Sequence, residues 1–210
     1  LSQEDVNIRI WIRDDGSTDN TLSMLRDSYG QDDRFTIQTG KNLGARESFF
    51  EALFSCDLNC DYFGFSDADD VWIPKKIRHS IDLLLATPFD VAAAVATRLH
   101  VVDENLNHIG YTAIPKRGFS FSNALVETVA SGASIVMNRS ALNIIRSARP
   151  RFAVMHDAWI YLVITAFGQF IYSDMPTIEY RQHAANVFGT SHSIRRKIIF
   201  RLRRLKYLSP

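Results

Sequence analysis

The sequence has little cysteine, proline or glycine and no long hydrophobic run. Two cysteines, Cys56 and Cys60, among 210 residues exclude a disulfide framework and predict free thiols in a reducing compartment. No apolar run reaches the roughly 20 residues of a transmembrane helix, and no signal peptide opens the chain. With 46% apolar residues, the composition predicts a globular, cytoplasmic protein with a substantial core.

Most of the chain has no excess of basic residues over acidic ones. The formal net charge is +1, but residues 194–210 hold seven basic residues and no acidic one, so acidic residues outnumber basic ones by six elsewhere. We therefore expect no nucleic-acid partner, because such a partner needs a basic body. Segment 194–210 also spaces isoleucine and leucine at helical intervals. This pattern favours an amphipathic helix on an anionic membrane surface, and a solvated helix packed on the body is the alternative.

Strand-length apolar runs alternate with segments of helical period, which is typical of an α/β sheet with crossover helices. No internal repeat interrupts the pattern. Predicted strands lie at 8–13, 35–38, 62–65, 91–95 and 133–137, with another ending at Tyr180, and a hairpin is predicted near 105–107. Predicted helices contain residues 22–29, 49–54, 77–85 and 157–167.

Three carboxylates follow the buried strand at 62–65, namely Asp67, Asp69 and Asp70. Open α/β sheets form their ligand crevices at the carboxyl ends of strands. Adjacent carboxylates repel one another unless a cation or solvent compensates them, and Mg²⁺ commonly links one or two carboxylates to substrate phosphates. One aspartate capping the next helix is the alternative, but a cap explains one aspartate and not three. The pattern favours a metal site.

A second polar run, Asp14 to Asn20, follows the strand at 8–13. Asp, Gly and Ser commonly build turns and helix caps, so a structural interpretation is open. A carboxylate at a strand end can also accept hydrogen bonds from a nucleobase or a ribose hydroxyl. The residues alone leave both interpretations open.

Six sequence blocks in a fixed order resemble the family-2 inverting glycosyltransferases, which have the GT-A fold. They are IRDDGSTDNT, NLGARESF, FSDADDVWIPKKI, GASIVMNRSA, MHDAW and YRQHAANVFG. The last three are most similar to a rhamnosyltransferase-like branch. The resemblance extends from about residue 7 to about residue 190 and implies a mixed, mostly parallel, Rossmann-like sheet flanked by helices. The family's first strand has no counterpart here and the chain starts at Leu1, so we expect that strand to be missing.

The resemblance also implies roles for residues that bind the donor. Asp14 and Asp15 are expected to contact the base and ribose of the nucleotide, with Asn42 near the nucleotide and Arg46 near a phosphate. These assignments rest on matching positions in the first two blocks.

Further roles concern the metal and the chemistry. Asp67 and Asp69 match the DxD motif, with Asp69 expected to contact Mg²⁺ or Mn²⁺ and Asp67 to contact ribose or metal. His183 resembles a histidine that helps to hold the metal or diphosphate in some relatives. Asp157 stands near a helix start, where a cap and a general base are equally consistent with the residues. The resemblance favours the base, with His156 packing beside it.

The expected organisation is a nucleotide-sugar-binding half at 1–96, an acceptor-binding and catalytic-base half at 97–190, and a basic C-terminal helix at 191–210. We expect inverting transfer from dTDP-rhamnose or a UDP-sugar to a saccharide or lipid-linked acceptor, in cell-surface polysaccharide synthesis at the inner face of the plasma membrane. A nucleotidyltransferase making nucleotide sugars and a non-catalytic nucleotide- or metal-binding module are the alternatives.

Overall fold

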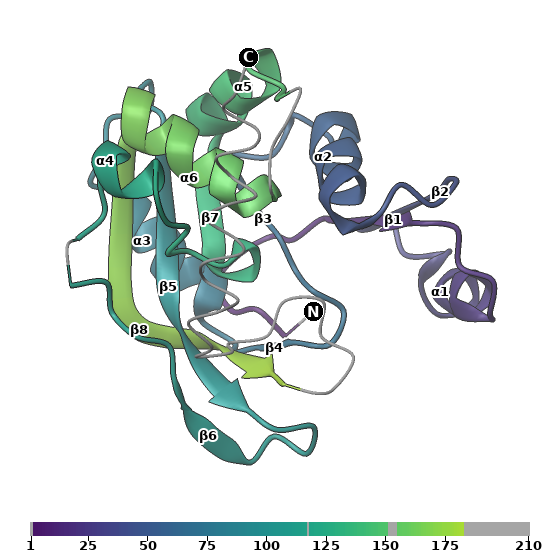
Figure 1. Cartoon of the computed structure of the whole chain (residues 1–210). Coiled ribbons are helices and arrows are strands. Elements are labelled where there is room, and N and C mark those ends of the chain that lie inside the picture. The colour runs from purple at the N-terminus through teal and green to yellow at the C-terminus, as the bar shows by residue number, and fades with distance from the viewer. Residues whose placement is uncertain (1, 117, 151–154, 183–210) are drawn as a thin grey trace.

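The computed structural model describes residues 2–116, 118–150 and 155–182. Within these ranges the chain forms two β-sheets, and helices cover both faces of the larger one (Figure 1). The fold class is therefore mixed α/β, as predicted. His183 and the basic segment 194–210 lie outside the described residues, so their predicted roles stay predictions.

The smaller sheet comes from the first 40 residues. β1 (Ile10–Asp14) and β2 (Phe35–Thr39) pair in parallel, with Ile12 opposite Ile37, and α1 (Thr21–Tyr29) connects them. α2 (Ala45–Ser55) follows β2 and packs beside β1. In Figure 1 this unit extends to one side of the larger sheet. Among the described residues, β1 has β2 as its single strand neighbour.

The larger sheet has six strands in the described part of the chain. Five follow the order β3-β7-β5-β8-β4, and β6 pairs with β5. β3 stands at one end, with β7 as its single neighbour among the described residues. The strands are β3 (Tyr62–Gly64), β4 (Val71–Trp72), β5 (Ala93–Val102), β6 (His108–Tyr111), β7 (Ile135–Asn138) and β8 (Gln169–Arg181).

The expectation of a mostly parallel sheet is wrong. In the larger sheet β5 and β8 pair in parallel, whereas the other four pairings are antiparallel. The reason is local for β6, because the turn at 103–107 reverses the chain in the predicted hairpin. β7 begins beside Ala96 and ends beside Ala94, so it also runs against β5, in the same direction as β6.

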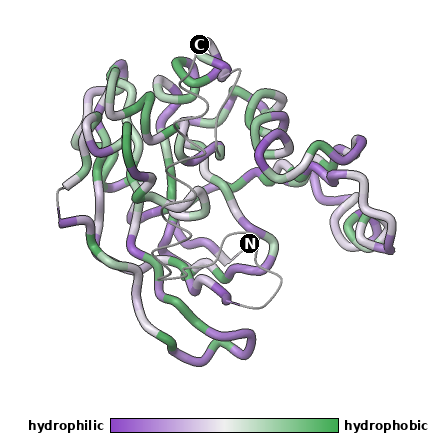
Figure 2. The backbone as a smooth tube through the Cα atoms, viewed as in Figure 1, coloured by the Kyte–Doolittle hydropathy of each residue, from purple (hydrophilic) through white to green (hydrophobic). Residues whose placement is uncertain are grey.

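Helices pack on both faces of β5, because its side chains point alternately to the two faces. Ala94 and Ala96 face the cluster that contains α6 (His156–Phe167) and α5 (Arg139–Ser147), while Ala93 and Val95 face α3 (Lys76–Leu84). Side chains of a strand alternate between faces, so a run of small buried residues lets helices approach from both sides. The tube in Figure 2 is mainly hydrophobic where β5 and β7 run side by side.

Three remaining observations bear on the sequence predictions. Cys56 and Cys60 are free thiols, as predicted. In the part of the chain that the structure describes, no helix is long and apolar enough to span a bilayer. β5 crosses the proposed 96/97 boundary, so the two halves share a strand, and their division by function stays a prediction.

Candidate functional site

Asp14 ends β1 and is buried, with its carboxylate satisfied by the chain itself. It accepts hydrogen bonds from the hydroxyl and backbone N–H of Ser17 and, at 3.2 Å, from the hydroxyl of Thr39. These bonds, that from the Ser17 hydroxyl most of all, lower the pKa of Asp14. Gly16 allows the turn because its φ of +79° is strained for other residues. Asp14 thus fixes the turn that follows β1.

Asp15 ties this turn to the loop that precedes α2. Its oxygens accept the backbone N–H groups of Leu43 at 2.9 Å and Gly44 at 2.8 Å, and Arg13 forms an ion pair with it. Burial raises the pKa of Asp15, but these hydrogen bonds outweigh it and the pKa is lowered. Arg13 also donates to Ser48 on α2 at 2.8 Å. The sequence analysis missed Arg13, although a cation directly before two aspartates is a usable signal.

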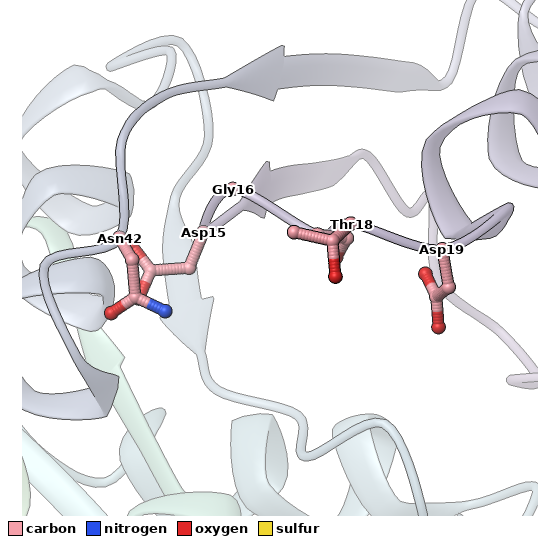
Figure 3. A pocket seen from close by; sticks show the side chains of 6 residues that line it. Asp15, Gly16, Thr18, Asp19 and Asn42 are labelled. Atoms are coloured by element: carbon pink, nitrogen blue, oxygen red, sulfur yellow. The ribbon is translucent and has the colours of Figure 1, made fainter.

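A pocket of about 430 Å³ opens on this turn, lined by Asp15, Gly16, Ser17, Thr18, Asp19 and Asn42. Figure 3 shows the side chains of Asp15, Thr18, Asp19 and Asn42 on one side of the backbone, with Asn42 beside Asp15. The structure therefore brings two predicted donor contacts, Asp15 and Asn42, together. Arg46 is not among the lining residues and forms an ion pair with Glu47 at 2.8 Å in the first turn of α2.

Replacing Asp15 tests whether this carboxylate organises the pocket. Asp15→Ala removes the acceptor of the Leu43 N–H, one of two acceptors of the Gly44 N–H, and the ion-pair partner of Arg13, whose side chain is 9% exposed. We expect a loss of about 1–3 kcal/mol in unfolding free energy, measured in urea, and weaker nucleotide binding by calorimetry. Thr18→Ala removes a side chain from the same pocket and serves as the control. Equal unfolding free energies for the two variants would contradict the role.

Asp67, Asp69 and Asp70 lie in the turn between β3 and β4. Burial raises the pKa of Asp67, and the charge of Asp69 raises it further. Asp70 accepts the backbone N–H of Arg181 at 3.0 Å, which anchors the acidic turn to the end of β8. Burial nevertheless raises the pKa of Asp70 to about 7. These carboxylates are close enough to repel one another, as the sequence predicted.

Lys76 is a charged residue behind this turn that the sequence analysis did not single out. Its side chain is fully buried, and its Nζ lies 4.6 Å from the centre of the Trp72 ring. Burial lowers the pKa of Lys76 to about 7, although the charge of Asp70 opposes the shift. Nζ of Lys76 has no hydrogen-bond partner among the described residues, and the charge of Asp70 is the one that favours its protonated form. Its position in the run PKK after DADDVW was the available signal.

The acidic turn fits a divalent cation in part. Among the described residues, no group of three aspartate, glutamate, histidine or cysteine side chains converges as a metal site. Asp67 and Asp69 still offer hard oxygen ligands under mutual repulsion, and one Asp70 oxygen is buried with no hydrogen-bond partner in the described chain. Two carboxylates completed by substrate phosphates and water are a common Mg²⁺ arrangement.

Asp157 lies in the first turn of α6. Its oxygens accept the backbone N–H groups of Ala158 at 2.6 Å and Gly132 at 3.3 Å. The capping position is Met155, so the interpretation of Asp157 as the N-cap is wrong. Burial raises the pKa of Asp157 to about 6, with a contribution from the charge of Asp67. The structure thus places the predicted base within electrostatic reach of the DxD motif.

Tyr180 and helix α2 border the region that contains the acidic turn and Asp157. Burial raises the pKa of Tyr180 to about 12, and the charges of Asp67 and Asp70 add to the shift, so Tyr180 lies beside the acidic turn. α2 contacts both groups of predicted residues, because Ser48 accepts a hydrogen bond from Arg13 and the ring centroid of Phe49 lies 4.2 Å from that of His156.

The profile described as Glycosyl transferase family 2 matches residues 1–145, which include the pocket turn and the acidic turn. The chain belongs to glycosyl transferase family 2. The match identifies this family-2 enzyme as a glycosyltransferase that uses a sugar donor and an acceptor. It favours transfer over the nucleotidyltransferase alternative. Asp157 lies beyond the matched residues, so its role rests on geometry and resemblance.

Two similar proteins extend this assignment. The chain is 29% identical over 214 residues to dTDP-rhamnosyl transferase RfbG of Shigella flexneri, covering 94% of this chain and 70% of that protein. The crystal structure of TarS from S. aureus matches with a TM-score of 0.60 at 14% identity, over 86% of this chain. The family-2 enzyme spans 32% of the TarS chain, and this likeness shows the shared fold.

Proposed function

We propose that this family-2 enzyme transfers a sugar from a nucleoside-diphosphate donor to an acceptor hydroxyl with inversion of the anomeric carbon. The proposal is supported by the family-2 match and by the pKa of Asp157, which burial and the charge of Asp67 raise to about 6. Inversion requires the acceptor to attack from the face opposite the leaving diphosphate. One carboxylate on each side of the donor sugar provides that arrangement.

Asp157 is the proposed general base. Its pKa of about 6 lies close to neutral pH, where a base is ionised yet still binds a proton strongly. The hydrogen bonds from Ala158 and Gly132 orient the carboxylate, leaving it to accept the proton of the attacking hydroxyl.

Asp69 and Asp67 are the proposed ligands of Mg²⁺ or Mn²⁺. When bound, such an ion would stabilise the negative charge that develops on the departing diphosphate. Asp70 and Lys76 hold the turn that presents the two ligands, through Arg181 on one side and Trp72 on the other. Asp15 and Asn42 are the proposed contacts for the nucleotide, in the pocket that they line.

The proposed donor is rhamnose on thymidine diphosphate, because the relative from Shigella flexneri carries that activity in its name. UDP-sugars are the second choice. A saccharide or lipid-linked acceptor stays a prediction, since the basic segment expected at a membrane lies outside the described residues.

A donor screen tests the proposal. We expect incubation with dTDP-rhamnose, UDP-glucose and UDP-N-acetylglucosamine, with Mn²⁺ and a saccharide panel, to release nucleoside diphosphate from one donor above the rest. EDTA should remove this release and added Mn²⁺ should restore it. Release of pyrophosphate instead would support nucleotidyl transfer, and binding of a donor without any turnover would support a binding module.

A further inference from the structure

His156 begins α6 and lies between three separate parts of the fold. The residue is 4% exposed, and its ring centroid lies 4.2 Å from that of Phe49 and 4.7 Å from that of Phe65. Neither ring nitrogen has a hydrogen-bond partner among the described residues. Buried polar groups without partners are uncommon and cost stability. An apolar residue would fill an ordinary core position better, so the choice of histidine needs a reason.

Gly132 supplies the first part of that reason. A methyl group built on Gly132 would lie 2.3 Å from Nε2 of His156, far inside van der Waals contact, so the ring rests directly against this backbone. The N–H of the same glycine donates to Oδ2 of Asp157 at 3.3 Å. One peptide unit therefore touches both the imidazole ring and the proposed base.

The two phenylalanines supply the second part. Phe65 stands two residues before Asp67, and Phe49 belongs to α2, next to the Ser48 that bonds Arg13. On its other side, His156 is joined by one peptide bond to Asp157. The ring is therefore a spacer between the chain segment that carries the DxD motif and the segment that carries the carboxylate.

We propose that His156 is a positioning residue, whose ring holds Gly132 against Asp157 and sets the separation between Asp157 and the DxD turn. Imidazole is the smallest aromatic ring, which suits a site where Gly132 has no room for a methyl group. A phenyl ring is too large, and a small aliphatic side chain leaves a gap. The inference rests on the proposed role of Asp157 as the base.

A double-mutant cycle tests the inference, using His156→Ala, Gly132→Ala and the two combined. Each single change should lower kcat for nucleoside diphosphate release by about 10- to 100-fold, because small misplacements of a reacting group cost that much. The donor KM should stay within about threefold. In the double variant the new methyl group enters the space left by the ring, so kcat should exceed the product of the two single effects by at least about tenfold.

A second readout needs no acceptor. The hydrogen bond from Gly132 lowers the pKa of Asp157, whereas burial and the charge of Asp67 raise it. Both single variants should therefore move the pKa of the Asp157 carboxyl away from its wild-type value of about 6, measured by carbon NMR titration. Ile145 lies on α5, in the hydrophobic cluster that also contains Phe65. Ile145→Ala should therefore destabilise the fold without changing the pKa of Asp157 or kcat.

The outcomes separate the two proposals. Wild-type kcat in both single variants, strictly additive effects, or an unchanged pKa of Asp157 would overturn the role of His156. If Asp157→Asn is inactive while His156→Ala keeps wild-type kcat, this inference alone fails. If Asp157→Asn keeps full turnover, the proposed function itself fails.

Discussion

Asp157→Asn is expected to lower turnover by about 10² to 10⁴-fold and, at the same time, to stabilise the protein. The loss follows from removing a general base. The gain follows from the pKa of Asp157, which burial raises to about 6 from 3.8, so that ionising the carboxyl costs folding free energy. Above pH 6 the unfolding free energy of the variant should exceed that of the wild type by about 2 kcal/mol, and this difference should vanish as pH falls towards 4.

The sign of this effect follows from linkage. A raised native pKa means that the folded state binds the proton more tightly, so wild-type stability falls as pH rises from about 4 through about 6. Urea unfolding at pH 4.5 and pH 8 measures the difference. Asp174→Asn makes the same chemical change at an exposed position of β8 and should alter neither stability nor turnover. Full activity in Asp157→Asn at pH 8 would refute the assignment of the base.

The second large effect is expected from replacing Asp67 and Asp69, the proposed metal ligands. Replacing Asp67 and Asp69 together by asparagine should lower Mn²⁺-dependent turnover by about 10²-fold or more, because charge developing on the diphosphate loses several kcal/mol of stabilisation. In the wild type, Mn²⁺ at about 100 times its Kd, with nucleoside diphosphate present, should add about 2.7 kcal/mol to the unfolding free energy. The double variant should lose this addition.

Metal-free stability distinguishes a metal site from a structural cluster. Burial and the charge of Asp69 raise the pKa of Asp67, so removing both charges should make the metal-free protein at least as stable as the wild type. Asp33→Asn, at an exposed position, is the matched control and should keep the response to Mn²⁺. A double variant that is still stabilised by Mn²⁺, or a metal-free variant that unfolds more easily, would contradict the assignment.

The sequence predicted those residues of the site whose positions depend on the end of a single strand. Asp67 and Asp69 could be chosen because a helix cap explains one aspartate after a buried strand and not three, whereas Asp157 was chosen from the family resemblance. His156 was expected to pack beside Asp157, and it is 4% exposed. Lys76 was not singled out, since its burial depends on how α3 meets the sheet. Leu85, at the end of the helix predicted at 77–85, is 63% exposed, whereas Lys76 is fully buried.

The directions of the strands within the sheet could not be predicted from the sequence pattern either. An apolar run such as Ile135 to Met137 indicates a buried strand, but the residues do not show in which direction it runs relative to β5. Direction is set by the long connection at 112–134, whose path depends on tertiary contacts such as the hydrogen bond of Ser120 N–H to the Tyr161 hydroxyl. α5 was missed because its start depends on the Asn138 side chain, which accepts Ala141 N–H at 2.9 Å.

The division of the strands between two sheets has a consequence for handling the protein. β1 and β3 each have one strand neighbour among the described residues, so each presents a row of backbone donors and acceptors that no other strand satisfies. Such rows are templates for pairing with a second molecule. Self-association of this chain at high concentration is expected to involve these two strands, whose carboxyl ends lead directly into the two acidic turns.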